Sequence, residues 1–180
     1  MKDYYFFYRS GSCFSQFHKC KYELNGYEYT TAEQGMMHGK ALLFGDEEVG
    51  AQILATSNPR KIKQLGRAVR GFNENVWKEN RETIVYQNNM AKFTQNDCMR
   101  AVLMSTKGTL LVEASPYDRI WGIGLGEAKA KRIPSTQWKG LNLLGKILTR
   151  VREDIAAMER SDEVAKESDS ASVEQGLEEE

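Results

Sequence analysis

The sequence has few of the residues on which metal sites and disulfide frameworks depend. Among its 180 residues are three cysteines and two histidines, and the cysteines show no C-x-x-C spacing. An odd number of cysteines cannot all pair, which argues against a disulfide scaffold. The two histidines form no H-E-x-x-H or similar ligand set, and neither a G-x-G-x-x-G fingerprint nor a G-x-S-x-G elbow occurs. We therefore expect no metal and no other cofactor.

Long hydrophobic runs are also missing, which argues against a membrane-spanning helix. The first residues, M-K-D-Y-Y, lack the apolar core and the cleavage site of a secretory signal, so we expect a cytoplasmic protein, with the nucleus as the alternative. Hydrophobic residues nevertheless make up 41% of the chain. A chain of this length and composition predicts one globular domain with a buried core.

The net charge is zero, but the charges are segregated along the chain. Residues 161–180 contain eight acidic residues and one basic residue, which leaves 24 basic and 17 acidic residues, a formal charge of +7, in residues 1–160. The positive part predicts an anionic partner. The acidic part lacks aromatic residues and apolar periodicity, so we expect a folded domain over 1–158 and a disordered tail over 159–180. In the alternative interpretation, the tail covers the basic face as an anion mimic.

Apolar periodicity and capping residues predict a helix-rich α+β domain with a small antiparallel sheet. The sheet is expected near the N-terminus, from a strand over 4–8 and a hairpin over 21–30 that turns at Asn25-Gly26. Further along, we expect a helix from the capping box at 30–34 to Phe44, a helix after Asp46, a helix after Asn58 closed by Gly66, a long helix over 76–93, a helix capped by Asp97, a strand over 109–114 and a last helix over 141–158.

Two carboxylates and a lysine are candidates for chemistry, since paired carboxylates are the means of cleaving glycosidic bonds. Glu33 falls in the first turn of a predicted helix, where it could equally be a capping carboxylate. Asp118 lies beside Trp121 in a glycine-containing loop over 115–137, where it could equally form an Asx-turn. Lys40 follows Glu33 by two helical turns and shares its face, as a phosphate contact, a Schiff-base nucleophile or a solvated side chain.

Short motifs recur in a characteristic order along the chain. They are F-S-Q-F at 14–17, Y-T-T-A-E at 29–33 followed by K-A at 40–41, G-R at 66–67, W at 77, A-K-F-T-Q-N at 91–96, L-V-E-A-S at 111–115, D at 118 with W-G-I-G at 121–124, and G-L-N-L-L-G at 140–145. In this order they resemble the YbiA-like, or NADAR, family over nearly all of residues 4–155. The chain departs from the family pattern at Gln16, where asparagine is usual, and at Gln34-Gly35, where His-Tyr is common, so we expect altered substrate contacts there.

The resemblance implies cleavage of N-glycosidic bonds to ribose, either in phosphorylated early riboflavin intermediates or in ADP-ribosylated bases, including guanine in nucleic acid. It implies that Glu33 stabilises the oxocarbenium-like centre or activates water, that Asp118 helps to bind the ribose or the leaving base, and that Lys40 binds phosphate or traps the opened ribose. The substrate contacts implied are Trp77 and Trp121 with Gly122 as walls of the site, Arg9, Arg67 and Lys92 as anion contacts, and Asn142 as a hydrogen-bonding residue.

From the sequence we thus expect a metal-independent N-glycosidase that removes ADP-ribose from ADP-ribosylated guanine in nucleic acid or nucleosides. A hydrolase of phosphorylated riboflavin intermediates is the alternative within the family. A non-catalytic module that binds ADP-ribose or nucleic acid, in which Glu33 only caps a helix, is the alternative of another class. The sequence predicts no membrane partner.

Overall fold

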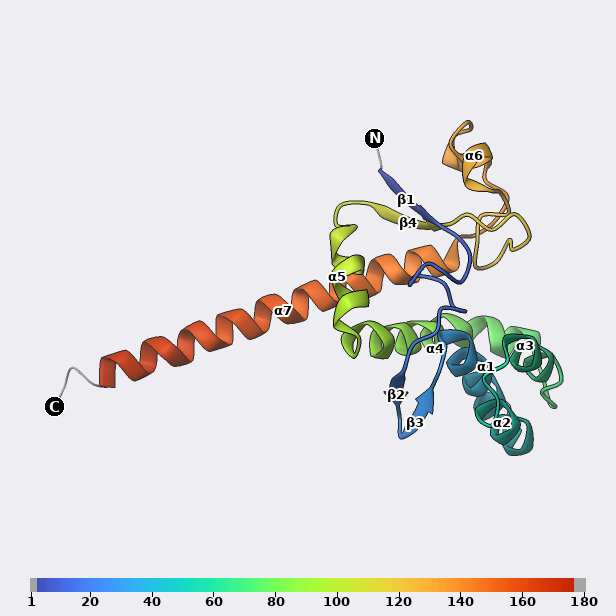
Figure 1. Ribbon diagram of the computed structural model, residues 1–180, viewed down its shortest axis with the longest axis horizontal. Helices are drawn as coiled ribbons and strands as arrows, with labels where there is room; N and C mark the ends of the chain where they lie inside the picture. The colour runs from blue at the N-terminus through green and yellow to red at the C-terminus, as the bar shows by residue number, and fades with distance from the viewer. Residues whose placement is uncertain (1–2, 177–180) are drawn as a thin grey trace.

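The computed structural model describes residues 3–176, and the surroundings of side chains up to residue 166. It shows a helix-rich α+β domain (Figure 1), as expected. In chain order the elements are β1 (Tyr4–Phe7), β2 (Tyr22–Leu24), β3 (Tyr27–Tyr29), α1 (Ala32–Leu43), α2 (Glu47–Leu54), α3 (Pro59–Arg67), α4 (Glu74–Thr94), α5 (Asp97–Ser105), β4 (Leu110–Glu113), α6 (Glu127–Ala130), a 3-10 helix η1 (Ser135–Gln137) and α7 (Leu143–Gly176).

The predicted capping residues begin three of the helices. The Thr31 hydroxyl accepts a hydrogen bond from the backbone N–H of Gln34, and the Gln34 side chain accepts one from the N–H of Thr30, so the capping box of α1 is confirmed. Asp46 and Asn58 cap α2 and α3 in the same way. These caps are local features, which explains why the sequence alone indicated them.

The prediction that Asp97 caps α5 is wrong by one position. The residue before the helix is Asn96, whose side chain makes no capping bond and instead donates to the carbonyls of Lys21 and Lys92. Asp97 is the first helical residue and forms an ion pair with Arg100 one turn later. The long helix α4 likewise begins two residues before its expected start, after Asn73.

Two separate two-stranded sheets replace the single antiparallel sheet that the sequence predicts. Strands β2 and β3 form the expected antiparallel hairpin, with Asn25 and Gly26 at positive φ. Strand β1 is not part of it and pairs in parallel with β4, Tyr4 opposite Leu110 and Phe7 opposite Glu113. Because the pairing is parallel, both strands end at the same edge, and the loops after Phe7 and after Glu113 meet there.

The core lies between α1, α4, α7 and the sheet of β1 and β4. Helix α1 packs on α2, α3 and α4, helix α4 also packs on α7, and α7 covers one face of β4. The other face of β4 buries Val112 against Ile123, Leu125 and Ala130. This packing fixes the first turn of α1 and the end of β4 relative to each other, which is the arrangement on which the candidate site depends.

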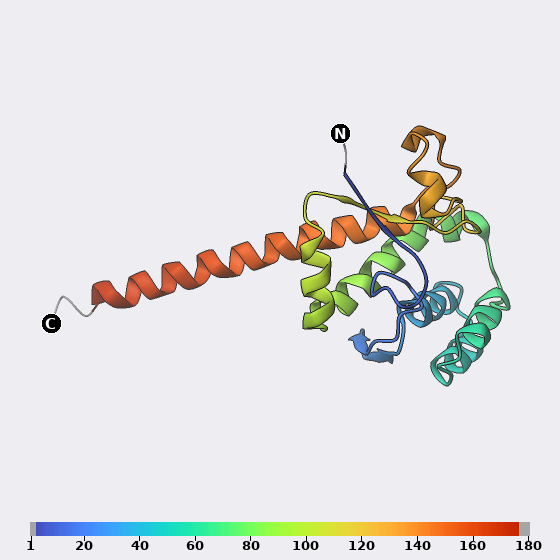
Figure 2. The same ribbon diagram turned by 45° about the horizontal axis from the view of Figure 1, so that its top comes forward.

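Helix α7 runs far beyond its expected end near residue 158 and reaches Gly176. Its side chains are buried as far as Ala156, and those from Ala157 to Lys166 are all exposed. Figures 1 and 2 show the helix projecting from the domain. The segment is rich in glutamate, alanine and lysine, which favour helix without burial, so the apolar period stops before the helix does. Of the expected tail, residues 177–180 lie outside the described residues, and the division at 158 stays a prediction. No described helix combines the length and the apolarity needed to cross a membrane.

Candidate active site

Two adjoining cavities lie at the edge where β1 and β4 end. The first, which we call the inner cavity, has a volume of about 350 Å³ and lies between α1, α3 and the loop after β4. The second, the outer groove, has a volume of about 800 Å³ and is walled by the loop after β1, by α3 and by the loop after β4. The two share Phe17, Lys63, Glu113 and Asp118, so they form one continuous cleft.

Glu33 lines the inner cavity from the first turn of α1 and is 4% exposed. Its carboxylate is not the helix cap, because Thr31 and Gln34 satisfy that end of the helix. None of the described residues donates a hydrogen bond to it. Burial raises the pKa of Glu33 from 4.5 to about 7, with Lys63 opposing and Asp118 adding to the rise. A buried carboxylate without a donor is costly, which is typical of a functional group rather than a structural one.

Glu113, which was not among the expected site residues, contributes a second carboxylate from the last position of β4. The pKa of Glu113 is raised to about 7. Burial is the largest cause, the charges of Asp118 and Glu33 add to the rise, and Lys63 opposes it. Its Oε2 atom is buried and has no hydrogen-bond partner within the described chain. Glu113 is the glutamate of the L-V-E-A-S motif, so the motif and its place at a strand end were the signals that could have revealed it.

Asp118 lines both cavities and also forms the Asx-turn that its sequence context predicts. Its Oδ1 atom accepts hydrogen bonds of 2.8 Å from the backbone N–H groups of Ile120 and Trp121. The structural and the functional interpretation are therefore compatible, because the turn is what places the carboxyl group and Trp121 at the cleft.

Lys40 lines the inner cavity on the same face of α1 as Glu33, as their spacing predicts. Its ammonium group donates a 2.7 Å hydrogen bond to the carbonyl of Gly66 and lies 4.4 Å from the ring centre of Phe72 and 5.6 Å from that of Trp77. Burial lowers its pKa from the usual value. Trp77 is thus placed behind Lys40 and does not itself line the cavity, so its contribution is to hold the lysine.

The remaining predicted contacts that reach the cleft are Trp121, Arg67 and Arg9. Trp121 and Arg67 line the inner cavity, and the guanidinium of Arg81 lies over the Trp121 indole at 5.9 Å. Arg9 lines the outer groove with a backbone φ of 69°, a left-handed conformation uncommon for a residue other than glycine.

Three residues that the family resemblance implies as substrate contacts line neither cavity and make contacts within the fold instead. Lys92 is fully buried and donates to the carbonyl of Ser15, and burial lowers its pKa to about 8. The Asn142 side chain accepts from the N–H of Glu113 and donates to the carbonyl of Leu111, so it fixes the end of β4. Gly122 is packed so closely that a Cβ atom there would lie 2.9 Å from the Glu113 carbonyl. Lys92 thus holds the segment around Ser15, whereas Asn142 and Gly122 contact the end of β4.

The residues that depart from the family pattern lie in different parts of the structure. Gln16 lines the inner cavity, is 5% exposed, and has a buried Nε2 group without an acceptor, while its Oε1 accepts from Asn89. Gln34 and Gly35 lie away from the cleft: Gln34 donates to carbonyls of α2 and the following residues, and Gly35 leaves room for Tyr22, which donates to Asn88. Of Gln16, Gln34 and Gly35, only Gln16 lines the cleft.

The chain matches one known protein family over most of its length. The NADAR domain family matches residues 5–156, which include every wall of the cleft. The chain belongs to the NADAR family. It is 48% identical over 127 residues to the N-glycosidase R617 of Acanthamoeba polyphaga mimivirus, covering 71% of this chain and 75% of that protein. It is also 36% identical over 170 residues to protein irg-1 of Caenorhabditis elegans, covering 86% and 80%.

The fold of this NADAR protein is similar to a solved structure of the Escherichia coli protein YbiA, determined by NMR. The two share 27% identity and a TM-score of 0.71, with 88% of this chain and 89% of the other covered. The likeness confirms the expected YbiA-like fold.

Proposed function

We propose that this NADAR protein is an N-glycosidase that hydrolyses the bond between ribose and a base, and that its substrate is an ADP-ribosylated guanine. The observation that carries the proposal is the buried carboxylate of Glu33, which has no hydrogen-bond donor among the described residues. It shares a cavity with the half-buried Glu113, whose Oε2 atom is buried, and with the cations of Lys63 and Arg67. The family membership and the likeness to an N-glycosidase support the reaction class.

The two carboxylates have different roles in the reaction. Both have pKa values near 7, and their mutual repulsion favours the state in which one is protonated and the other is ionised. Lys63 favours the charged form of Glu33, whereas the two neighbouring carboxylates favour the neutral form of Glu113. Glu113 therefore donates a proton to the departing base, and Glu33 stabilises the oxocarbenium-like C1′ and activates the water that attacks it.

The cations of the inner cavity favour a substrate with more than one phosphate charge. Lys63 and Arg67 lie on the same helix one turn apart, and both line the cavity beside the carboxylates. Such a pair suits the diphosphate of ADP-ribose, with the indole of Trp121 as a stacking surface for the base. A phosphorylated ribosylamino-pyrimidine, which carries one phosphate, leaves one of these cations without a partner.

The proposal is tested by incubating the purified protein with an ADP-ribosylated guanine oligonucleotide and, separately, with a phosphorylated ribosylamino-pyrimidine. We expect release of ADP-ribose from the first, and loss of that release in Glu33→Gln by a factor of about 10² to 10⁴. Glu47→Gln is the matched control, since Glu47 is an exposed first-turn glutamate of α2. Release from the pyrimidine alone would make the protein a hydrolase of riboflavin intermediates, and full activity of Glu33→Gln would exclude the proposed role of Glu33.

A further inference from the structure

Strand β1 has a free edge. On the side of β4, the carbonyls of Asp3 and Phe7 accept hydrogen bonds from the N–H groups of Leu110 and Ala114. The backbone groups of successive strand residues point to opposite edges. The residues whose groups point away from β4 are Tyr4, Phe6 and Tyr8. No hydrogen bond from the rest of the described chain reaches this free edge.

Other strand edges of the domain are closed by side chains. On the outer edge of β4, Thr149 and Asn142 accept hydrogen bonds from backbone N–H groups of the strand. On β2, the Gln95 side chain accepts from the N–H of Glu23 and donates to its carbonyl. An uncovered edge is a template for a further strand, and proteins usually blunt it with a charged residue or a proline. Strand β1, with the sequence Y-Y-F-F, contains neither.

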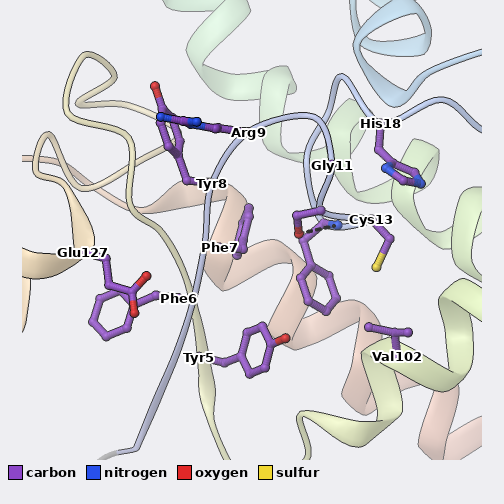
Figure 3. Close-up of a pocket in the computed structure, with 12 residues that line it drawn as sticks. Tyr5, Phe6, Phe7, Tyr8, Arg9, Gly11, Cys13, His18, Val102 and Glu127 are labelled. Carbon is purple, nitrogen blue, oxygen red and sulfur yellow. Dashed lines mark hydrogen bonds between the residues drawn. The ribbon is translucent and has the colours of Figure 1, made fainter.

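A cavity with a volume of about 600 Å³, which we call the edge cavity, lies along β1. In Figure 3, β1 runs across it, with Phe6 on one side of the strand and Tyr5 and Phe7 on the other. Three of the lining side chains are apolar or aromatic and lie open to solvent: Tyr5 and Tyr8 are 41% exposed, and Val102 is 42% exposed. Exposed apolar side chains gathered beside an open strand edge are typical of an interaction surface.

The two ends of β1 carry opposite charges. Asp3 precedes the strand and Arg9 follows it, both side chains are exposed, and neither forms an ion pair within the described chain. Antiparallel pairing of two copies of β1 about a two-fold axis at Phe6 sets Asp3 of each copy opposite Arg9 of the other. A shift of this register by two residues sets Asp3 opposite Phe7 or Gly11 instead. Charge complementarity therefore selects one register for a second copy of the same strand.

We propose that two copies of this chain pair along the free edges of β1 and form a four-stranded sheet in the order β4-β1-β1-β4, with Phe6 at the two-fold axis. The outward backbone groups then bond to each other, Tyr4 lies opposite Tyr8, and Tyr5 lies opposite Phe7. The pairing covers the exposed rings of Tyr5 and Tyr8. Because Tyr8 also lines the outer groove, each copy borders the candidate active site of the other. The dimer does not depend on the proposed reaction.

Sedimentation velocity of the full chain, between about 1 and about 200 µM, tests the proposal, since the mean mass should rise towards twice that of one chain. Asp3→Arg and Arg9→Asp each set like charges opposite one another twice per dimer, so each should weaken dimerisation about 5- to 20-fold. Aspartate tolerates the φ of 69° at position 9. The double variant Asp3→Arg/Arg9→Asp restores opposite charges and should regain the dimer affinity of the wild type. Glu28→Arg, exposed on β3, is the matched control and should dimerise as the wild type.

Hydrogen exchange followed by NMR locates the interface without any substitution. The N–H of Phe6 should exchange freely in dilute protein and be protected in concentrated protein, whereas the N–H of Tyr5, which faces β4, should be protected in both. A chain that stays monomeric up to about 200 µM would overturn the proposal, and so would a dimer that leaves the N–H of Phe6 unprotected. A double variant that dimerises no better than the single variants would overturn it as well, because the two charges would then not be opposite one another.

Discussion

The carboxylates of Glu33 and Glu113, which lie 80 residues apart in the chain, line one cavity, and the charge of Glu33 raises the pKa of Glu113. Because β1 and β4 pair in parallel, β4 ends at the cleft, next to the end of β1. The Asn142 side chain holds that end in place by accepting a hydrogen bond from the N–H of Glu113. Helix α1 brings Glu33 to the same place through its capped first turn. The coupling of the two acids is therefore a product of tertiary structure.

The first prediction concerns the pH dependence of kcat. With both pKa values near 7 and one proton shared, activity should be bell-shaped with a maximum near pH 7. Glu113→Gln removes the group that must be protonated, so the alkaline limb should disappear. What remains should be a much slower reaction that rises with pH to a plateau as Glu33 ionises. Glu28→Gln, exposed on β3, should keep the wild-type profile. An alkaline limb that persists in Glu113→Gln would assign the proton to another group.

The second prediction concerns stability. The pKa of Glu33 is raised in the folded protein, so between pH 4.5 and 7 the folded state binds more protons than the unfolded state, and stability falls as pH rises through that window. Glu33→Gln abolishes this loss. The variant should be more stable than the wild type by about 3 kcal/mol at pH 8 and nearly equal in stability near pH 4.5. Thermal unfolding at the two pH values measures it, and a variant destabilised at pH 8 would mean that the carboxylate supports the fold.

The third prediction concerns Gln16, whose buried Nε2 group has no acceptor and lines the inner cavity. We expect it to donate a hydrogen bond to the substrate. Gln16→Met removes the donor at similar length and should raise KM about 5- to 10-fold, which corresponds to about 1 kcal/mol, with kcat little changed. Gln87→Met, exposed on α4, is the control. An unchanged KM would show that Gln16 serves only its contact with Asn89.

Local sequence signals predicted the helices well, whereas pairings between distant segments were not accessible to them. The caps at Thr31, Asp46 and Asn58 depend on side chains within three residues, and the structure confirms them. The partner of β1 is more than 100 residues away, and no local pattern distinguishes joining the nearby hairpin from pairing with β4.

The candidate site shows the same limit. Glu33, Lys40 and Asp118 were expected at one site, and they line one cavity. Glu113 lies in the L-V-E-A-S motif but was missed, because its place beside Glu33 depends on the pairing of β4 with the distant strand β1. The motifs predict Lys92 and Asn142 as ligand contacts, since a polar residue in a motif can serve the fold or the substrate. In the structure Lys92 donates to Ser15, Asn142 donates to Leu111, and neither residue lines the cleft.

The fourth prediction concerns Lys40, whose lowered pKa and position beside the carboxylates suit a nucleophile. We expect its ammonium to pass its proton to the Glu113 carboxylate, and its amine to add to C1′ of the ribose once the base has left. Ring opening then gives a Schiff base, which the water activated by Glu33 hydrolyses to release the amine. Borohydride added during turnover should then give a protein adduct with the mass of the reduced ribosyl group, located at Lys40 by peptide mass spectrometry. Lys40→Arg keeps the charge but lacks the nucleophile and should give no adduct. Full turnover in Lys40→Arg would reduce the role of Lys40 to anion binding.

The last prediction concerns the acidic C-terminal segment. The side chains from Ala157 to Lys166 are exposed, and helix α7 projects away from the domain, so the described residues of this segment add little to the packing of the core (Figure 2). A chain ending at Arg160 should unfold at the same temperature as the full chain and cleave a modified nucleoside at the same rate. Its affinity for a single strand is the informative measurement, because removal of eight acids and one base leaves a formal charge of +7. We expect a change of less than about threefold at a salt concentration near 0.15 M, where charges more than about 8 Å apart are screened. A rise of tenfold or more would mean that the acidic segment returns to the basic face of the domain and competes with nucleic acid as an anion mimic.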